Sequence, residues 1–286
     1  MFAGAASAVS ASRRLGLYVV LRDDPATAIA QARSLGFSEV EIYNDNFAPA
    51  FADRLAAALE KHRVAPVSLF SMGPGPMVWN FIDGPRTVGL VPREHRRARV
   101  RHLIDASEFA RKFRIPRVET HCGFIPEDPG NPLYPETVEA IREAAGHCRG
   151  NRQEFLYHAG QETAATLLRI IEDVGLDNQR IGFDTANPVT CSTGSPVDFA
   201  EMLGRYLSLV NFKDGLFPTD GRRFGRETPI GQGKVQFRDL MTKLKQVGYS
   251  GPLLIEREIS GPQFEADIRA SKLYLERLAR EAKLFE

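Results

Sequence analysis

Residues 180–188 read R-I-G-F-D-T-A-N-P, a short apolar run of strand length that reaches an acid, Asp184, and breaks at Asn187-Pro188. Placing a carboxylate at the end of an apolar strand is unfavourable unless its charge is needed there. The stretch therefore predicts a β-strand that delivers a functional side chain at its carboxyl end.

Three other stretches of the chain have the same form. Residues 154–160 (EFLYHAG) carry His158, residues 207–215 (LSLVNFKDG) carry Asn211 ahead of Lys213 and Asp214, and residues 252–258 (PLLIERE) carry Glu256. If these strands are parallel neighbours in one sheet, their carboxyl ends lie on the same side. We therefore expect His158, Asp184, Asn211 and Glu256 to converge on one site.

The whole chain alternates between strand and helix. Apolar runs predict eight strands, at residues 15–21, 39–44, 65–72, 117–123, 154–160, 181–187, 207–214 and 252–258, each followed by helical spacing of apolar residues. Eight such units in 286 residues favour an α/β fold, a single (β/α)8 TIM barrel over residues 15–286, with residues 1–14 as a disordered or ragged tail. A doubly wound sheet is disfavoured because residues 21–24 lack a glycine-rich first turn.

The long irregular loops, at residues 73–93, 124–135 and 215–234, all follow strands, whereas the helix-to-strand connections are short. In TIM barrels the loops after the strands surround the active site. Trp79 and Phe217 lie in two of these loops. We expect both rings to lie near the barrel mouth and help cover the ligand, because aromatic faces pack against apolar C–H surface.

Charge and composition narrow the kinds of partner. The net charge is +1, from 37 basic and 36 acidic residues, which favours neither nucleic acid nor a membrane as a partner. The three cysteines lie at long spacings that fit neither a disulfide framework nor a zinc ribbon. No apolar run approaches the ~20 residues of a transmembrane helix. We expect a cytoplasmic protein that acts on a small molecule, with a homo-oligomer left open.

The four converging side chains have the chemistry of a divalent metal site. Carboxylates, an imidazole and an amide carbonyl suit Mn²⁺, Mg²⁺, Co²⁺ or Zn²⁺, and the absence of a thiolate favours the harder ions. Alternatively, each is a strand-end polar group satisfied by local hydrogen bonds. Four in succession on adjacent strands are harder to explain in that way.

Other residues are weaker candidates. His121 ends the fourth predicted strand, where a substrate contact and a local hydrogen bond are both open. The basic run of Arg93, Arg96, Arg97, Arg99 and Arg101 predicts a solvated helix face, as do His62, His95, His102 and His147. The glycines at 225, 231 and 233 lack the spacing of a phosphate-binding loop.

Six ordered motifs carry a family resemblance: VETHCGFIPE, GQET, FDxAN, KDG, GxGKVxF and IEREISG. Together they resemble the sugar phosphate isomerase/epimerase family of xylose isomerase-like TIM barrels, from about Leu15 to the last helix. The resemblance implies a divalent metal, often Mn²⁺, held by a glutamate on strand 5, an aspartate on strand 6, a histidine on strand 7 and a glutamate on strand 8. The two glutamates of that family also form the acid/base pair that moves a proton next to a sugar carbonyl.

By position, Asp184 and Glu256 match the strand-6 and strand-8 ligands, but His158 stands in the place of the strand-5 glutamate and Asn211 in that of the strand-7 histidine. The formal charge of the ligands falls from −3 to −2, so we expect a weaker metal site that can be empty after purification. The expected catalytic residues are Glu256 and His158. The expected substrate-binding residues are His121, Trp79, Asn187, Lys213 and Glu258.

The leading functional hypothesis is a metal-dependent isomerase or epimerase that abstracts a proton next to the carbonyl of a sugar or keto-sugar. Two matched bases are needed to remove a proton from one face and return one to the other, and a metal-bound imidazole nitrogen cannot serve as one of them. A lyase or dehydratase, which needs a single base, is therefore the first alternative. The second is a non-catalytic sugar-binding relative with a degenerate metal site.

Overall fold

The computed structural model describes residues 15–284; the predicted tail at residues 1–14 and the last two residues lie outside the described part. Eight parallel strands close into a barrel in the order β1-β10-β7-β6-β5-β4-β3-β2. They are β1 (Leu15–Val20), β2 (Glu39–Tyr43), β3 (Ala65–Phe70), β4 (Arg117–Thr120), β5 (Glu154–Ala159), β6 (Gln179–Asp184), β7 (Leu207–Phe212) and β10 (Leu253–Ile255). The predicted single (β/α)8 barrel is confirmed.

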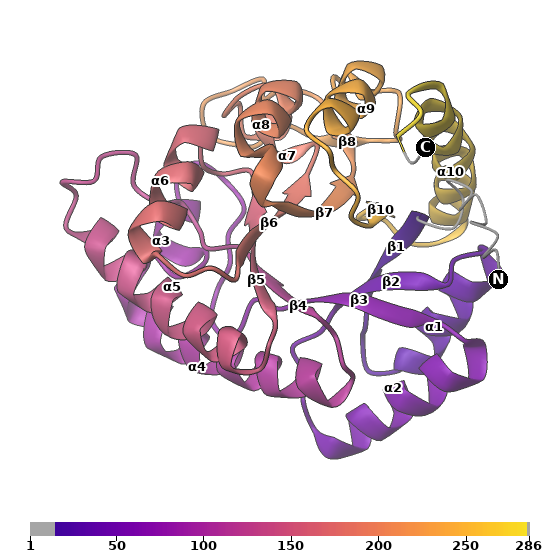
Figure 1. Ribbon diagram of the computed structural model, residues 1–286, viewed down its shortest axis with the longest axis horizontal. Coiled ribbons are helices and arrows are strands. Elements are labelled where there is room, and N and C mark those ends of the chain that lie inside the picture. The colour runs from indigo at the N-terminus through magenta and orange to yellow at the C-terminus, as the bar shows by residue number, and fades with distance from the viewer. Residues whose placement is uncertain (1–14, 285–286) are drawn as a thin grey trace, which may run out of the picture.

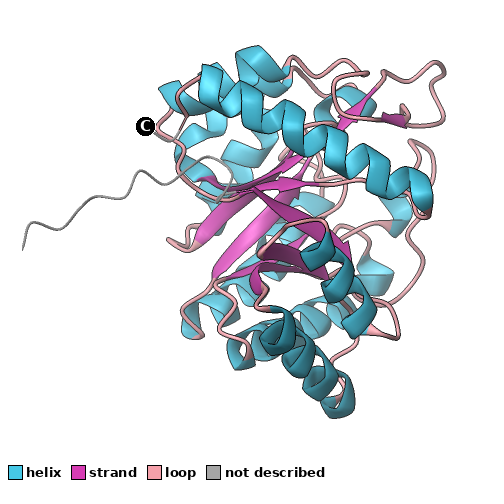
Figure 2. Cartoon of the chain, turned by 90° about the vertical axis from the view of Figure 1, so that its right-hand side faces the viewer, coloured by secondary structure: helices cyan, strands magenta, loops and turns pink. Residues whose placement is uncertain are grey.

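Helices surround the strands on the outside (Figures 1 and 2). They are α1 (Pro25–Ser34), α2 (Pro49–His62), α4 (Arg93–Lys112), α5 (Leu133–Gly150), α6 (Ala164–Val174), α8 (Pro196–Leu203), α9 (Phe237–Gln246) and α10 (Pro262–Glu281), with the short helices α3 (Gly84–Thr87), α7 (Asn187–Thr190) and a 3-10 turn at Gly204–Tyr206. Within residues 15–284, no helix combines the length and the apolar composition that crossing a bilayer requires.

The outward side chains of the strands form the main core with these helices. Phe183 of β6 stacks on Phe199 of α8 at 5.9 Å between ring centroids, and Phe212 of β7 meets Phe237 of α9 at the same distance. Because side chains alternate along a strand, the neighbours of these phenylalanines point into the barrel. The alternation that directs Phe183 and Phe212 toward the helices therefore directs their neighbours Asp184 and Asn211 into the barrel.

Arg99 holds the long loop after β3 and is not part of a solvated helix face. Its side chain is 1% exposed and donates hydrogen bonds to the backbone oxygens of Pro74 (3.0 Å), Pro76 (2.9 Å) and Gly89 (2.7 Å). These bonds satisfy a buried guanidinium with carbonyl groups of a long loop whose only helix, among the described residues, is the short α3. The expectation for Arg99 was wrong, because its role depends on a loop whose path the sequence pattern does not give.

Asp214 organises the long loop after β7 in a similar way. Its buried carboxylate accepts hydrogen bonds from the backbone N–H groups of Gly215, Gly231, Gly233 and Val235. A two-stranded antiparallel sheet, β8 (Asp214–Gly215) with β9 (Glu227–Thr228), closes the same loop. The aspartate of the K-D-G motif is therefore structural, and it fixes the loop that lies beside the preceding lysine.

Asp45, just after β2, links three segments at the barrel mouth. One carboxylate oxygen, Oδ1, lies 2.7 Å from His102 Nε2 and accepts hydrogen bonds from Ser71 Oγ (2.6 Å) and from the amides of Met72 and Gly73 (3.0 and 3.1 Å). Burial alone would raise the pKa of Asp45, but these hydrogen bonds hold it well below its usual value. His102 thus contacts a neighbouring loop, unlike the solvated histidine that we expected.

We predict that Asp45→Asn lowers the free energy of unfolding at pH 7 by about 1–2 kcal/mol, because hydrogen bonds to a charged group are lost at a partly exposed site. A depressed folded pKa contributes stability above the unfolded pKa of about 3.9, and this contribution is lost as the pH falls further. The gap between wild type and variant in urea denaturation should therefore narrow below about pH 4. Asp53→Asn, on the exposed face of α2, is the control. A gap that does not change with pH would contradict this account of Asp45.

Candidate functional site

The four predicted residues meet at the carboxyl end of the barrel. His158 and Asn211 are the penultimate residues of β5 and β7, Asp184 ends β6, and Glu256 directly follows β10. All four are buried. One ligand atom from each of His158, Asp184 and Glu256 lies within 4.8 Å of the other two. Strands that are neighbours in the barrel thus bring together residues far apart in the chain, as their positions predicted.

Lys213 places a cation inside this cluster. Its Nζ lies 3.0 Å from Glu256 Oε1, 2.6 Å from Glu258 Oε1 and 3.4 Å from Asp184 Oδ2. Burial would lower the pKa of Lys213, but these carboxylates raise it well above its usual value, so the amine stays charged. In return, although burial alone would raise the pKa of Asp184, the Lys213 ammonium and His158 bring it down to about 2.

Asn211 bridges two carboxylates through its amide nitrogen. Nδ2 donates to Glu41 Oε2 at 2.7 Å and to Glu256 Oε2 at 2.9 Å, which fixes the orientation of the amide group. Its oxygen, Oδ1, is buried and has no hydrogen-bond partner. Asn211 therefore positions Glu256, and its amide oxygen remains without a hydrogen bond.

Two buried acids behind the site were missed by the sequence reasoning. Glu119 of β4 accepts a hydrogen bond from His158 Nδ1 at 2.7 Å, and it also contacts Ser68 of β3. Burial, and then the neighbouring charge of Glu119, raise the pKa of Glu41 well above its usual value, which favours the protonated form of Glu41. The available signal was an acid within each apolar strand, E-V-E-I-Y and R-V-E-T.

Glu119 determines which nitrogen of His158 faces the cluster. Because Nδ1 donates to Glu119, Nε2 is directed toward Asp184, whose Oδ2 lies 3.7 Å away. Burial would lower the pKa of His158, but the Asp184 and Glu119 carboxylates raise it well above its usual value. A carboxylate that orients a histidine in this way is the usual partner of a metal-binding imidazole.

The residues present fit a divalent cation. Asp184 Oδ2 and Asn211 Oδ1 are buried and make no hydrogen bond, and Asp184 Oδ2 has only the longer contacts with Lys213 Nζ (3.4 Å) and His158 Nε2 (3.7 Å). Burying an oxygen without a hydrogen bond is unfavourable. Together with His158 Nε2 and a Glu256 oxygen they form a set of mostly hard donors. The ammonium of Lys213 shares two of the same carboxylates, so an ion would compete with it.

The predicted substrate-binding residues lie around the cluster. His121, Trp79, Asn187, Lys213 and Glu258 all line one hollow at the barrel mouth together with His158. The Trp79 ring packs on His121 at 4.8 Å, and His121 Nδ1 lies 2.9 Å from Gln161 Oε1. Phe217 is 51% exposed and is absent from this lining, whereas Phe224 of the same loop is part of it. The position expected for Phe217 is therefore taken by Phe224.

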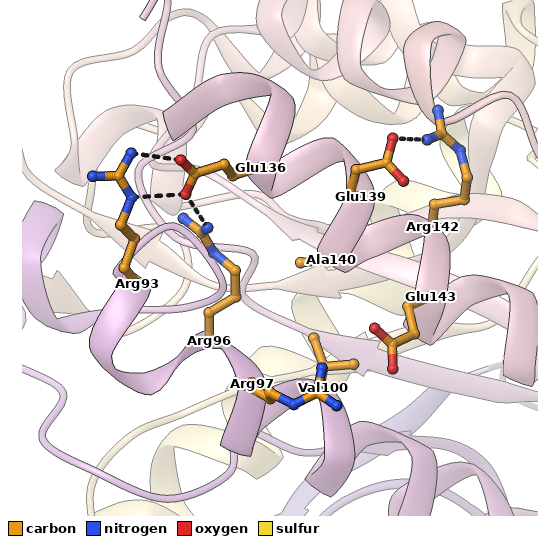
Figure 3. A pocket seen from close by; sticks show the side chains of 9 residues that line it. All are labelled: Arg93, Arg96, Arg97, Val100, Glu136, Glu139, Ala140, Arg142 and Glu143. Atoms are coloured by element: carbon orange, nitrogen blue, oxygen red, sulfur yellow. Dashed lines mark hydrogen bonds and ion pairs between the residues drawn. The ribbon is translucent and has the colours of Figure 1, made fainter. Parts of the chain in front are cut away.

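A separate cavity of about 480 Å³ lies on the outer surface between α4 and α5 (Figure 3). Its charges pair mostly with one another: Glu136 accepts from Arg93 and Arg96, and Arg142 contacts Glu139. None of the predicted site residues lines it. This cavity is therefore separate from the predicted site at the barrel mouth.

We predict that Lys213→Met lowers the melting temperature and tightens Mn²⁺ binding at least tenfold, about 1.4 kcal/mol, since the carboxylates lose their internal cation. Added Mn²⁺ should then restore much of the lost melting temperature. Calorimetric titration and thermal melts provide both readouts, and Lys61→Met on exposed α2 is the control. Unchanged or weaker Mn²⁺ binding in Lys213→Met would contradict the shared use of these carboxylates.

Gly182 of β6 makes room for Glu119, because a Cβ at this position would lie 1.9 Å from Glu119 Oε1. We predict that Gly182→Ala costs about 1–3 kcal/mol of stability by overpacking and weakens Mn²⁺ binding, because the displaced Glu119 no longer orients His158. Gly150→Ala, where a Cβ meets nothing within 4 Å, should leave both quantities near their wild-type values. Wild-type Mn²⁺ affinity in Gly182→Ala would refute the orienting role of Glu119.

Comparison with known proteins agrees with this architecture. The chain resembles the xylose isomerase domain protein of Planctomyces limnophilus, with a TM-score of 0.88 and 29% identity over 94% of this chain and 98% of that one. A D-tagatose 3-epimerase-like protein superposes with a TM-score of 0.73 at 20% identity, over 94% and 98% of the two chains. An uncharacterized protein of Methanocaldococcus jannaschii is 30% identical over 57% of this chain, and the match spans 58% of that protein. The family model of xylose isomerase-like TIM barrels matches residues 29–278, and the chain therefore belongs to that family.

Proposed function

We propose that this protein is a metal-dependent enzyme that abstracts a proton next to the carbonyl of a sugar or keto-sugar, with isomerisation or epimerisation as the outcome. The observation that carries the proposal is the buried convergence of Glu256, His158 and Asp184 at the barrel mouth. The similarity in fold to a D-tagatose 3-epimerase-like protein supports a sugar as the substrate.

In this proposal, a divalent ion would be held by His158 Nε2, Asp184 Oδ2, Glu256 and Asn211 Oδ1, and Mn²⁺ is the first choice among first-row ions that accept mixed oxygen and nitrogen donors. When bound, it would supply Lewis acidity toward the substrate carbonyl. The chain itself orients the donors: Glu119 fixes the imidazole of His158, and Asn211 fixes the carboxylate of Glu256.

Glu256 is the proposed proton acceptor. Burial raises its pKa to about 7, although Lys213 opposes the rise. A general base works best when its pKa lies near the working pH. Lys213, which donates to Glu256 Oε1, holds the carboxylate in place and helps to balance its charge when the proton leaves.

A lyase is the second candidate, and the geometry of His158 favours it. Nδ1 of His158 is bound to Glu119, which leaves Nε2 as the nitrogen available to the site. If Nε2 binds the ion, Glu256 is the remaining base of the pair. A single base suffices for removal of a proton followed by loss of a leaving group from the neighbouring carbon.

The proposal is tested by incubating the Mn²⁺-loaded protein with a panel of ketohexoses, aldoses and 3-keto-sugars in D₂O and following the products by NMR and mass spectrometry. We expect deuterium to replace the proton next to the carbonyl in at least one sugar, with an isomer or epimer as the product. Loss of water with formation of a conjugated ketone would instead establish the lyase. Binding of a sugar without exchange would indicate a non-catalytic relative.

Glu256→Gln should lower the exchange rate at least a hundredfold, because a neutral amide cannot accept the proton. Sugar binding, followed by the fluorescence of Trp79, should remain. Glu60→Gln on the exposed face of α2 should leave the rate unchanged. Exchange that continues in Glu256→Gln would remove Glu256 from the proposed role.

A further inference from the structure

The barrel mouth is divided into two compartments that share Trp79, His121, His158 and Glu258. One, of about 160 Å³, has polar walls that include Gln161, Asn187 and Lys213. The other, of about 360 Å³, has apolar and aromatic walls formed by Tyr18, Tyr43, Phe70, Met72 and Met77. Glu256, the proposed base, lines the second compartment. The reacting part of a ligand would therefore lie where the two compartments meet.

We propose that the substrate is an uncharged sugar that carries an apolar, preferably aromatic, substituent: the sugar occupies the polar compartment and the substituent occupies the apolar one. This inference rests on the proposed function, since it assigns a substrate class to the same site. It adds a subsite that the proton-transfer chemistry itself does not require.

The charges of the lining disfavour a phosphorylated or otherwise anionic sugar. Glu227, Glu256 and Glu258 line the compartments, whereas no arginine is found among the described lining residues. The ammonium of Lys213 is already shared by three carboxylates, and His158 faces Glu119 and Asp184. His121 already has a neutral partner, because its Nδ1 lies 2.9 Å from Gln161 Oε1. A phosphate would find no unpaired side-chain cation among the described residues that line the two compartments, and recognition of phosphate normally uses one.

The apolar compartment has the volume and the walls for a ring. Phe70 lies in its wall, with the centroid of its ring 6.1 Å from that of Tyr18, 5.5 Å from that of Tyr43 and 4.9 Å from that of His158, all edge-on. Its volume exceeds the ~150 Å³ of a protein cavity that holds benzene. Trp79, 43% exposed, stands between the compartments and could pack against either part of the ligand. An unsubstituted monosaccharide would leave these apolar walls in contact with water.

The test is a binding measurement on the full-length protein with phenyl glycosides, methyl glycosides and 6-phosphates of glucose, galactose and mannose. Trp79 is the single tryptophan of the chain, so its fluorescence reports binding, with calorimetry as a second readout. We expect at least one phenyl glycoside to bind tenfold or more tightly than its methyl counterpart, and the 6-phosphates to bind more weakly than either. Equal binding of phenyl and methyl glycosides, no binding of any phenyl glycoside, or preference for a 6-phosphate would overturn the inference.

A variant of Met77 tests whether the phenyl group binds in the apolar compartment. Met77→Asp introduces a charge into its wall, so the advantage of phenyl over methyl glycosides should disappear while binding of the methyl glycoside remains. Val78→Asp, next in the chain but outside the lining, should keep the advantage. Survival of the advantage in Met77→Asp would place the phenyl group elsewhere and overturn the subsite. Because no step here requires turnover, failure of the subsite is distinguishable from failure of deuterium exchange, which tests the proposed reaction.

Discussion

The ion cluster around Lys213 is the constraint on which the site depends. Each buried ion costs several kcal/mol unless it is paired with good geometry. Asp184, Glu256 and Glu258 are brought together by strands whose order is fixed by the barrel, and the Lys213 ammonium lies within 3.4 Å of an oxygen of each. Without this cation, or an ion in its place, three carboxylates would face one another at the mouth. The conformation of the acids is therefore set before any ligand arrives.

A second group of buried ionisable side chains lies inside the barrel. His158, Glu119 and Glu41 come from three different strands, and the proton that Glu41 can hold reduces the number of buried negative charges. Gly182 belongs to the same arrangement, since its missing side chain is the space that Glu119 occupies. The imidazole that replaces the expected strand-5 carboxylate thus has a buried acid as its support. His158 at the strand-5 position is therefore accompanied by Glu119, which binds it, and by Gly182, which leaves space for Glu119.

Much of the fold and part of the site could be predicted from the sequence. The alternation of apolar strands and amphipathic helices indicated eight units, and the position of each polar residue at a strand end indicated which side chains converge. Glu41, Glu119 and Asp45 could not be found in this way, because their partners lie on other strands or helices and a pattern along one segment does not identify them. Arg99 was misplaced for the same reason: within α4 it resembles its solvated neighbours, but a loop covers it. Local periodicity thus predicts elements, whereas buried polar pairs depend on the tertiary fold.

The resemblance to the family implies a glutamate on strand 5 and a histidine on strand 7, where this chain has His158 and Asn211. One carboxylate is lost, an amide takes the place of a histidine, and Lys213 shares the two acids that remain. We propose that these residues nevertheless form one ion site at the carboxyl end of the barrel. Anomalous diffraction from a crystal soaked in Mn²⁺ tests this proposal most directly: the expected result is one ion bound directly by His158 Nε2 and by oxygens of Asp184 and Glu256. An ion bound elsewhere on the molecule, with this cluster unchanged and Lys213 still in contact with all three carboxylates, would contradict it.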